Sequence, residues 1–219
     1  MTKIKICGIK TIESAVAAAE AGADFIGLVF AQSPHQVTPT QANKIITALK
    51  LRAKVPGIVG VFVNTPSEAV NQIAEFCSLD RVQLSGDETF EYCRGLKPAT
   101  VKVMRVNRLH KAEQVCQDMS AWVKGLYGKD NIFLLDAYDP DKFGGTGNLL
   151  DWKIAAYIAE KYRVIVAGGL TPDNVGDAIK KIKPWGVDVS SGVETGGEKD
   201  MNKIKDFIKA AREADAVIA

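Results

Sequence analysis

The sequence predicts an α/β fold in which eight β-strand and α-helix units close into a (β/α)8 barrel. Eight short apolar or β-branched runs follow one another at a mean spacing of about 26 residues, which fits one strand, one helix and two short loops. Segments with helical periodicity lie between these runs. The 219 residues suit a barrel with few insertions.

The predicted strands are β-branched or apolar and end where polar or glycine-rich segments begin. Their ends lie at or near Cys7, Phe30, Val63, Leu84, Val106, Asp136, Ala167 and Ser190. Such strands alternating with helices are typical of an all-parallel sheet. A doubly wound sheet is the alternative, but no G-x-G-x-x-G follows the first strand, so the closed TIM barrel is favoured. No linker divides the chain, and we expect a single domain over residues 1–219.

Thr-Pro pairs predict the starts of three helices. They stand at Thr38-Pro39, Thr65-Pro66 and Thr171-Pro172. A threonine side chain can accept an N–H of the first turn, and proline suits the first helical position, where no N–H is needed. Glu68 follows Thr65 by three residues, which predicts a capping box at the second of these helices.

Composition and charge exclude several classes of protein. The chain is 47% hydrophobic and 25% charged, with a formal net charge of +2 and no basic stripe, so we expect no nucleic-acid partner. Its apolar runs are far shorter than the roughly 20 residues that cross a bilayer. The N-terminus alternates charged and apolar residues, unlike a signal peptide. We therefore expect a cytoplasmic protein with no membrane partner.

Cysteines and histidines give no metal-ligand pattern. The four cysteines, at positions 7, 77, 93 and 116, form no C-x-x-C pair, and the two histidines are His35 and His110. We therefore expect no metal site.

The first strand carries a candidate reactive thiol. Period-two alternation puts Lys5 and Cys7 on one face and Ile4 and Ile6 on the other. Active sites of such barrels lie where the strands end, so Cys7 is expected to point into the barrel mouth beside Gly8. The alternative is a small buried hydrophobic residue, as expected for the other three cysteines.

The sixth strand, residues 132–136, is apolar and ends in the carboxylate of Asp136. A buried acid must be paired or have a raised pKa, and a raised pKa suits a general acid. The alternative is a helix cap or a solvated aspartate. The long connection that follows contains Gly144, Gly145, Thr146 and Gly147, a candidate lid or simply a mobile loop.

Glycine-rich turns follow the last two strands. Gly168 and Gly169 follow the seventh, and Ser191 and Gly192 follow the eighth; these are the loops that commonly bind phosphate in such barrels. Asp188 shares the inward parity of Ser190. If the barrel closes, strands one and eight are neighbours, and Asp188 can pair with Lys5.

Eight sequence blocks, in order along nearly the whole chain, carry a family resemblance. They are residues 5–9, 57–64, 82–84, 86–88, 144–147, 151–152, 167–170 and 187–194. Through these blocks the chain resembles the phosphoribosylanthranilate isomerase family of tryptophan biosynthesis.

The resemblance implies an isomerase that needs neither cofactor nor metal. The implied reaction is the Amadori rearrangement of N-(5-phosphoribosyl)anthranilate to 1-(2-carboxyphenylamino)-1-deoxyribulose 5-phosphate. Asp136 would be the general acid that opens the ribose ring, and Cys7 the general base at C2′, a task that requires thiolate character. The phosphate would bind at Gly168, Gly169, Ser191 and Gly192. The partner is thus a small phosphosugar, and the protein a monomer or homodimer.

Two positions depart from the family pattern. His35 stands where the family usually has the arginine that holds the anthranilate carboxylate, and Ser85 stands where it usually has a histidine. His35 and Arg105 are the candidate carboxylate ligands. Two alternatives stay open: a non-catalytic or divergent phosphosugar-binding barrel, and the related sugar isomerase of histidine synthesis, which would call for an aspartate in place of Cys7.

Overall fold

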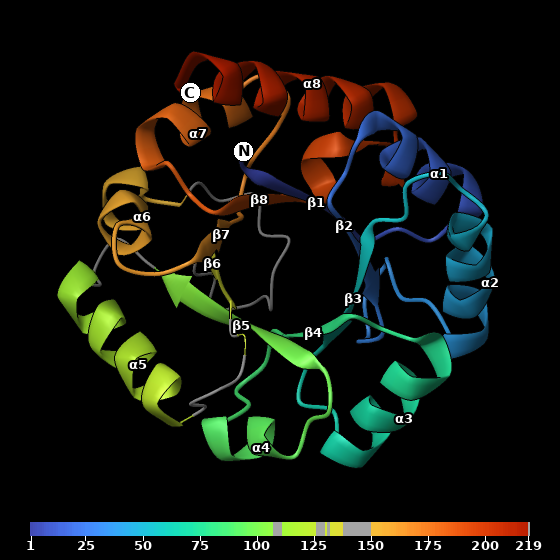
Figure 1. The fold of residues 1–219 in the computed structure, drawn as a ribbon, viewed down its shortest axis with the longest axis horizontal. Helices are drawn as coiled ribbons and strands as arrows, with labels where there is room; N and C mark the ends of the chain where they lie inside the picture. Colours follow the sequence, from blue (N-terminus) through green and yellow to red (C-terminus); the bar gives the residue numbers. More distant parts are fainter. Residues whose placement is uncertain (107–110, 126–129, 131, 138–149, 219) are drawn as a thin grey trace.

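A computed structural model describes residues 1–106, 111–125, 130, 132–137 and 150–218. The candidate lid residues Gly144, Gly145, Thr146 and Gly147 lie outside the described residues, as does His110. The strands β1 to β8 form a closed parallel barrel in chain order (Figure 1), so the predicted fold class is confirmed. The strands are β1 (Lys3–Cys7), β2 (Phe25–Val29), β3 (Gly57–Phe62), β4 (Arg81–Leu84), β5 (Ala99–Val106), β6 (Ile132–Ala137), β7 (Val164–Val166) and β8 (Gly186–Val189).

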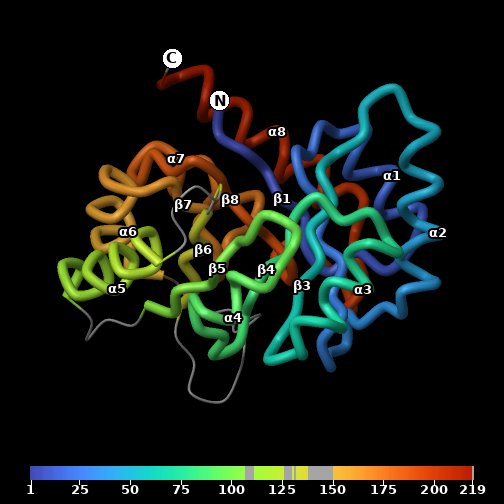
Figure 2. Tube along the Cα trace, turned by 60° about the horizontal axis from the view of Figure 1, so that its bottom comes forward, coloured from blue at the N-terminus to red at the C-terminus, as the bar shows by residue number. Residues whose placement is uncertain are grey.

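Helices surround this barrel, as Figures 1 and 2 show. Those in the described ranges are α1 (Ile12–Ala21), α2 (Pro39–Lys50), α3 (Ser67–Cys77), α4 (Phe90–Arg94), α5 (Ala112–Gly125), α6 (Trp152–Ala159), α7 (Val175–Ile182) and α8 (Met201–Ile218). A short 3-10 turn, η1 (Ser191–Val193), and a two-stranded hairpin, β9 (Glu194–Thr195) and β10 (Glu198–Lys199), lie between β8 and α8. None of the helices in the described ranges has the length and apolar character needed to cross a bilayer.

Strand ends agree with the sequence pattern to within one residue, because the change from apolar to polar residues marks where each strand leaves the sheet. β1, β4 and β5 end at the predicted positions, and the others end one residue to either side.

Side chains alternate between two hydrophobic regions. Val101 and Val103 of β5, Ile132 and Leu134 of β6, and Ile165 of β7 pack together in one small cluster. The alternate residues Phe133 and Leu135 of β6 and Val164 and Val166 of β7 join the larger cluster, to which the helices also contribute. This period-two division gives the barrel a packed interior and a separate helix-facing shell.

The three Thr-Pro pairs have different outcomes. Thr38 caps α2 as predicted, in a capping box with Gln41, and Pro39 is the first helical residue. The predicted box between Thr65 and Glu68 is wrong. α3 begins at Ser67 with no side-chain cap, and the Thr65 hydroxyl instead donates to the Val63 carbonyl at 3.4 Å.

Thr171-Pro172 also does not begin a helix, which corrects the third prediction. α7 begins at Val175. The Asn174 side chain accepts from the Thr171 N–H at 2.8 Å and donates to the Gly169 carbonyl at 2.9 Å. Because the Asn174 side chain accepts the Thr171 N–H and also donates to Gly169, the Thr-Pro pair forms a turn that supports the glycine loop after β7.

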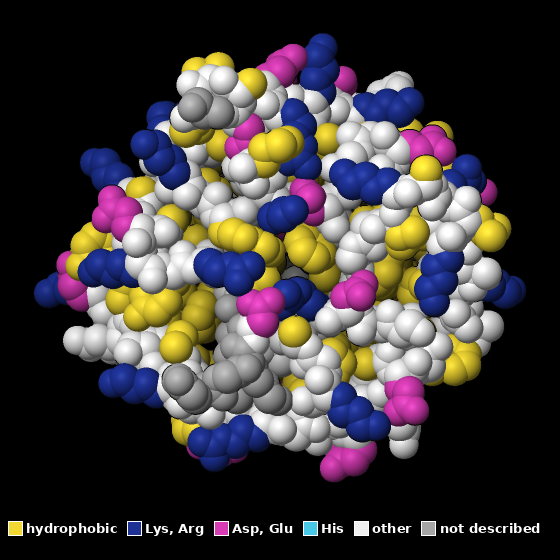
Figure 3. Space-filling view, viewed as in Figure 1, with side chains coloured by type: hydrophobic (Ala, Val, Ile, Leu, Met, Phe, Trp, Pro, Cys, Tyr) yellow, Lys and Arg dark blue, Asp and Glu magenta, His cyan; other side chains and the backbone are white. Residues whose placement is uncertain are grey.

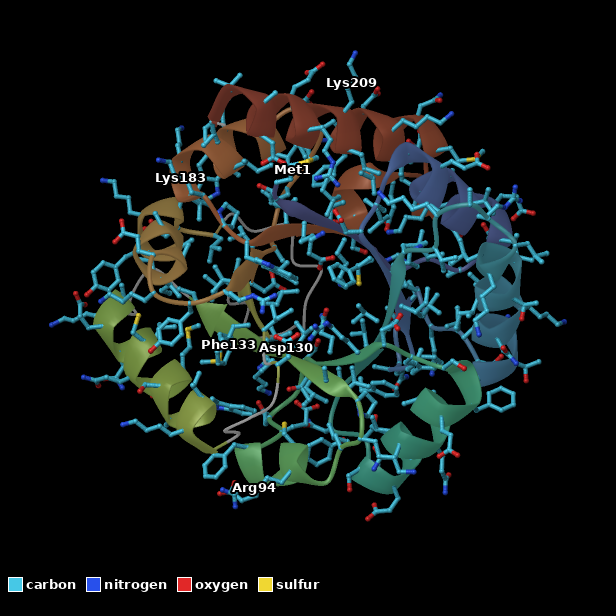
Figure 4. All side chains as sticks on the ribbon, viewed as in Figure 1. Met1, Arg94, Asp130, Phe133, Lys183 and Lys209 are labelled. Carbon is cyan, nitrogen blue, oxygen red and sulfur yellow. The ribbon has the colours of Figure 1, made fainter. Side chains whose placement is uncertain are left out.

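Two ion pairs of Asp130 link the amino ends of β4 and β7. Asp130, near the centre of the view in Figure 4, precedes β6 and binds both Arg81 and Arg163. Basic and acidic side chains are interspersed over the face shown in Figure 3.

The chain termini lie on the same side of the barrel (Figure 2). The Thr2 N–H donates to one oxygen of the Asp215 carboxylate at 2.9 Å, and the Thr2 hydroxyl donates to the other at 2.6 Å. The start of β1 is therefore held directly against the end of α8.

We expect Thr38→Ala to lower the free energy of unfolding by about 1 kcal/mol, because the variant loses the N-cap acceptor of α2. Urea denaturation measures this change. Thr40→Ala is the control, since Thr40 is exposed in the same helix, and it should change stability by no more than about 0.5 kcal/mol. Equal losses in the two variants would contradict the capping role.

Candidate active site

A buried ion pair lies between the first and last strands. Lys5 of β1 and Asp188 of β8 are register partners, and Lys5 Nζ is 2.8 Å from Asp188 Oδ1. The Lys5 side chain is 1% exposed. The pair inferred from strand parity is confirmed. Although burial disfavours the Lys5 ammonium, attraction to Asp188 and then to Cys7 raises its pKa above the usual range, so it stays charged.

Asp136 lies next to this pair, near the end of β6, and is 9% exposed. Burial, reinforced by the negative charge of Asp188, raises the pKa of Asp136 to about 6. The Ala137 N–H, which donates to Asp136 at 2.9 Å, opposes this rise, as do Arg105 and Lys5. The carboxyl group can therefore hold and release a proton near neutral pH, as a general acid must.

Cys7 ends β1 and is 7% exposed, so it is buried at the barrel mouth. The thiol has space because β2 carries Gly27 alongside; a Cβ there would come within 2.7 Å of Cys7 Sγ. Burial raises the pKa of Cys7, Lys5 and Lys199 lower it, and Asp188 raises it further. The unliganded protein therefore holds a thiol, and the two lysines supply the charge that favours its thiolate.

The four predicted phosphate ligands lie around one pocket. It is lined by residues 167–170, residues 188–192 and Asp136. Gly168 and Gly169 have φ of 84° and 65°, in the left-handed region. A Cβ on Gly192 would lie 1.8 Å from the Leu170 carbonyl oxygen, so the two turns are in close contact.

Backbone donors are available in this pocket. Among the described residues, no acceptor takes the N–H groups of Gly169, Ser191 or Gly192. Free N–H groups beside a short helical turn are donors of the kind that can bind an anion. The pocket that these residues line is also lined by Asp136.

His35 lies on the β1 side of the mouth. Its Nε2 is 3.5 Å from Glu194 Oε1. Burial lowers the pKa of His35; Lys199 and Lys10 lower it further, against the opposing effects of Glu194 and Glu198. His35 is therefore a neutral imidazole at neutral pH. This weakens the expectation that it replaces a family arginine as a cation.

Arg105 lies on the opposite side of the mouth. It is the residue before the last in β5, is the register partner of Asp136, and donates to the Ser85 carbonyl. Its Nη1 is 3.6 Å from Asp87 Oδ1. Ser85 is itself buried and accepts from Gln83 Nε2 at 3.2 Å. The two candidate carboxylate ligands are thus separated: Arg105 is the register partner of Asp136, and His35 lies against Gly8, the residue after Cys7.

Sequence analysis missed Lys199 and the role of its partner Glu194. They form a buried ion pair across the β9–β10 hairpin, beside His35. The Gly196-Gly197 dipeptide between the two strands is the signal that could have predicted this hairpin.

A closed (β/α)8 barrel with its titratable groups and a glycine-lined pocket at the carboxyl ends of the strands has the architecture of a TIM-barrel enzyme. A family model described as N-(5'phosphoribosyl)anthranilate (PRA) isomerase matches residues 4–210. The chain belongs to this family and is an isomerase.

Individual relatives agree with this assignment. The N-(5'-phosphoribosyl)anthranilate isomerase of Dehalococcoides mccartyi is 47% identical over 215 residues, which cover 98% of each chain. That of Pelobacter propionicus is 45% identical over 97% of each chain.

Solved structures are also similar. The phosphoribosyl anthranilate isomerase of Thermotoga maritima superposes with a TM-score of 0.83 at 34% identity, over 97% of this chain and all of that one. Another isomerase structure, in complex with reduced 1-(o-carboxyphenylamino)-1-deoxyribulose 5-phosphate, gives 0.80 at 33% identity over the same shares.

We expect Asp136→Asn to increase stability above pH 6 and to change it little below pH 4. The folded protein holds the Asp136 proton with a pKa of about 6, against an ordinary 3.8. Wild-type stability therefore falls as pH rises through this window, by about 3 kcal/mol in total. Asparagine does not titrate and avoids that loss.

Urea unfolding of both proteins at pH 4 and pH 8 measures this effect. Asp206→Asn, at an exposed position of α8, is the control and should give the same stability difference at both pH values. If the Asp136→Asn difference did not change with pH, the carboxyl group would not have a raised pKa.

Proposed function

We propose that this protein catalyses the Amadori rearrangement of N-(5-phosphoribosyl)anthranilate to 1-(2-carboxyphenylamino)-1-deoxyribulose 5-phosphate in tryptophan biosynthesis, acting as one barrel domain over residues 1–219. The observation that carries the proposal is the juxtaposition of a raised-pKa carboxyl group, a thiol beside Lys5, and an anion pocket that Asp136 itself lines. Family membership and the product-like ligand of a 33% identical relative support the choice of substrate.

Asp136 acts first, as the general acid. Its proton goes to the ribose ring oxygen, the bond from C1′ to that oxygen breaks, and the nitrogen lone pair forms an iminium at C1′. A carboxyl group with a pKa of about 6 suits this step, because it is strong enough to give up its proton and still partly protonated near neutral pH.

Cys7 acts second, as the general base. Its thiolate removes the proton from C2′, and the electron pair of that C–H bond neutralises the iminium to give an enolamine. The enolamine gains a proton at C1′ and loses the hydroxyl proton at C2′, which leaves the ketone. The Lys5 ammonium supports this step because it favours the thiolate.

Binding energy comes from the two ends of the substrate. The backbone N–H groups of Gly168, Gly169, Ser191 and Gly192 hold the phosphate beside Asp136. At the other end we assign the anthranilate carboxylate to Arg105, because a guanidinium is always charged and His35 is neutral. A neutral His35 contributes at most a hydrogen bond. The protein works as a monomer or homodimer.

Cys7→Ser and Asp136→Asn should each lower kcat/KM by at least about 100-fold, since each variant loses a positioned acid or base. The assay follows the loss of substrate fluorescence with freshly prepared phosphoribosylanthranilate. Cys77→Ser is the matched control, because Cys77 is also buried but lies at the end of α3, and it should keep wild-type turnover. Near-normal turnover in either of the first two variants removes that residue from the mechanism, and an inactive wild type overturns the proposed function.

At pH 8, Arg105→Met should raise KM by about 10-fold or more, since it removes a charged carboxylate ligand. His35→Ala should raise KM by less than about 3-fold, because it removes at most one neutral hydrogen bond. The wild-type KM should also stay flat between pH 7 and pH 9, where His35 is already neutral. If His35→Ala raised KM more than Arg105→Met did, or if the wild-type KM rose with pH, His35 and not Arg105 would be the carboxylate ligand.

A further inference from the structure

The Lys199 ammonium is buried and satisfied entirely by the protein. Its side chain is 4% exposed. Lys199 Nζ donates to the Ser190 carbonyl at 3.0 Å, to the Ser190 hydroxyl at 3.2 Å and to the Glu194 carboxylate. An ammonium has three N–H donors, so these acceptors use all of them. Lys199 is therefore not available to bind substrate directly.

Two of these three bonds hold the turn that begins the phosphate pocket. Ser190 immediately precedes Ser191 and Gly192 and is the N-cap residue of η1. Its backbone has φ of −123° and ψ of −85°, outside the helical and strand regions. The Ser190 carbonyl also accepts from the Val193 N–H at 3.3 Å. The two hydrogen bonds from Lys199 thus stabilise a Ser190 backbone conformation that belongs to neither a helix nor a strand.

The hairpin that carries Lys199 is anchored on both strands. Lys203 donates to the Glu194 carbonyl at 2.7 Å, and Lys10, from the loop after β1, binds Glu198 at 2.9 Å. The hairpin is therefore joined to α8 through Lys203 and, by an exposed ion pair, to the loop after β1.

The same contacts reach the loop that follows Cys7. A Cβ built on Gly8 would lie 3.0 Å from Ser190 Oγ and 3.3 Å from Lys199 Nζ. It would also lie 3.2 Å from His35 Cγ. Lys199 and Ser190 are therefore packed against the segment adjoining the thiol, and neither can shift without disturbing it.

We propose that Lys199 is a positioning residue that holds the Ser190–Gly192 turn in the conformation that binds the substrate phosphate. The proposal rests on the phosphate site of the proposed function. Glu194 keeps the ammonium in place and compensates its burial, since a buried charge without a partner is costly.

Lys199→Met should raise the inhibition constant of inorganic phosphate and the KM for phosphoribosylanthranilate by about 10-fold each, because the variant loses the donor that holds the Ser190 turn. The variant should also lower kcat, because it removes one of the two cations that favour the Cys7 thiolate, so the phosphate constant is the decisive readout. Calorimetric titration of each protein with inorganic phosphate compares their phosphate affinities without turnover. A residue important only for stability would lower Tm and leave both constants unchanged.

Lys10→Met is the matched control. It removes one positive charge from the loop after β1, where Lys10 forms an exposed ion pair with Glu198 of the hairpin. Lys10 touches neither Ser190 nor Glu194, so phosphate binding and KM should stay within about 2-fold of wild type. If it weakened phosphate binding as much as Lys199→Met, long-range charge would explain the effect, and the positioning role would be overturned.

A double variant covers the case in which Lys199→Met does not fold. Lys199→Met with Glu194→Leu replaces the whole buried pair by apolar side chains, which proteins often tolerate. It still lacks the donor to Ser190 and should bind phosphate about 10-fold more weakly, as in the single variant. Wild-type phosphate binding in any folded variant that lacks Lys199 overturns the inference. A wild type that binds phosphate but converts no substrate would instead refute the proposed function alone.

Discussion

Closure of the barrel depends on placing two opposite charges in its interior. Lys5 and Asp188 come from the first and last strands, so they meet only when β1 pairs with β8. Either residue alone would be a buried charge costing several kcal/mol, roughly 3–5 when one partner is removed. The same pair sets the electrostatics of the mouth, because Asp188 raises and Lys5 lowers the pKa of both Cys7 and Asp136. Correct folding and reactive chemistry therefore share one interaction.

The two sides of the barrel mouth carry titratable groups for which burial has opposite consequences. On the β5–β6 side, the proposed mechanism requires Asp136 to hold a proton, and burial favours its neutral form. On the β1 side, the proposed mechanism requires Cys7 to lose a proton, and burial opposes this. The buried environment would therefore assist the proposed acid directly, whereas the proposed base depends on the charges of Lys5 and Lys199.

Features that depend on local periodicity could be predicted from the sequence, and those that depend on contacts between loops could not. Strand ends, the inward parity of Lys5, Cys7 and Asp188, and the glycine turns follow from alternation and chain order alone. The failed cap at Thr65 and the turn at Thr171 show that a capping motif competes with other hydrogen-bond partners, which a sequence does not rank. Burial lowers the pKa of His35, and Lys199, far away in the chain, lowers it further.

The bond between Thr2 and Asp215 has a consequence for how the chain could be rearranged. It holds the first strand and last helix side by side at the amino ends of the strands, while the pocket and the titratable groups lie at the carboxyl ends. A short linker could therefore join the two ends, and new ends could be opened in an exposed loop, without altering the reactive face. The protein is thus suited to circular permutation and to fusion with a second enzyme through either terminus.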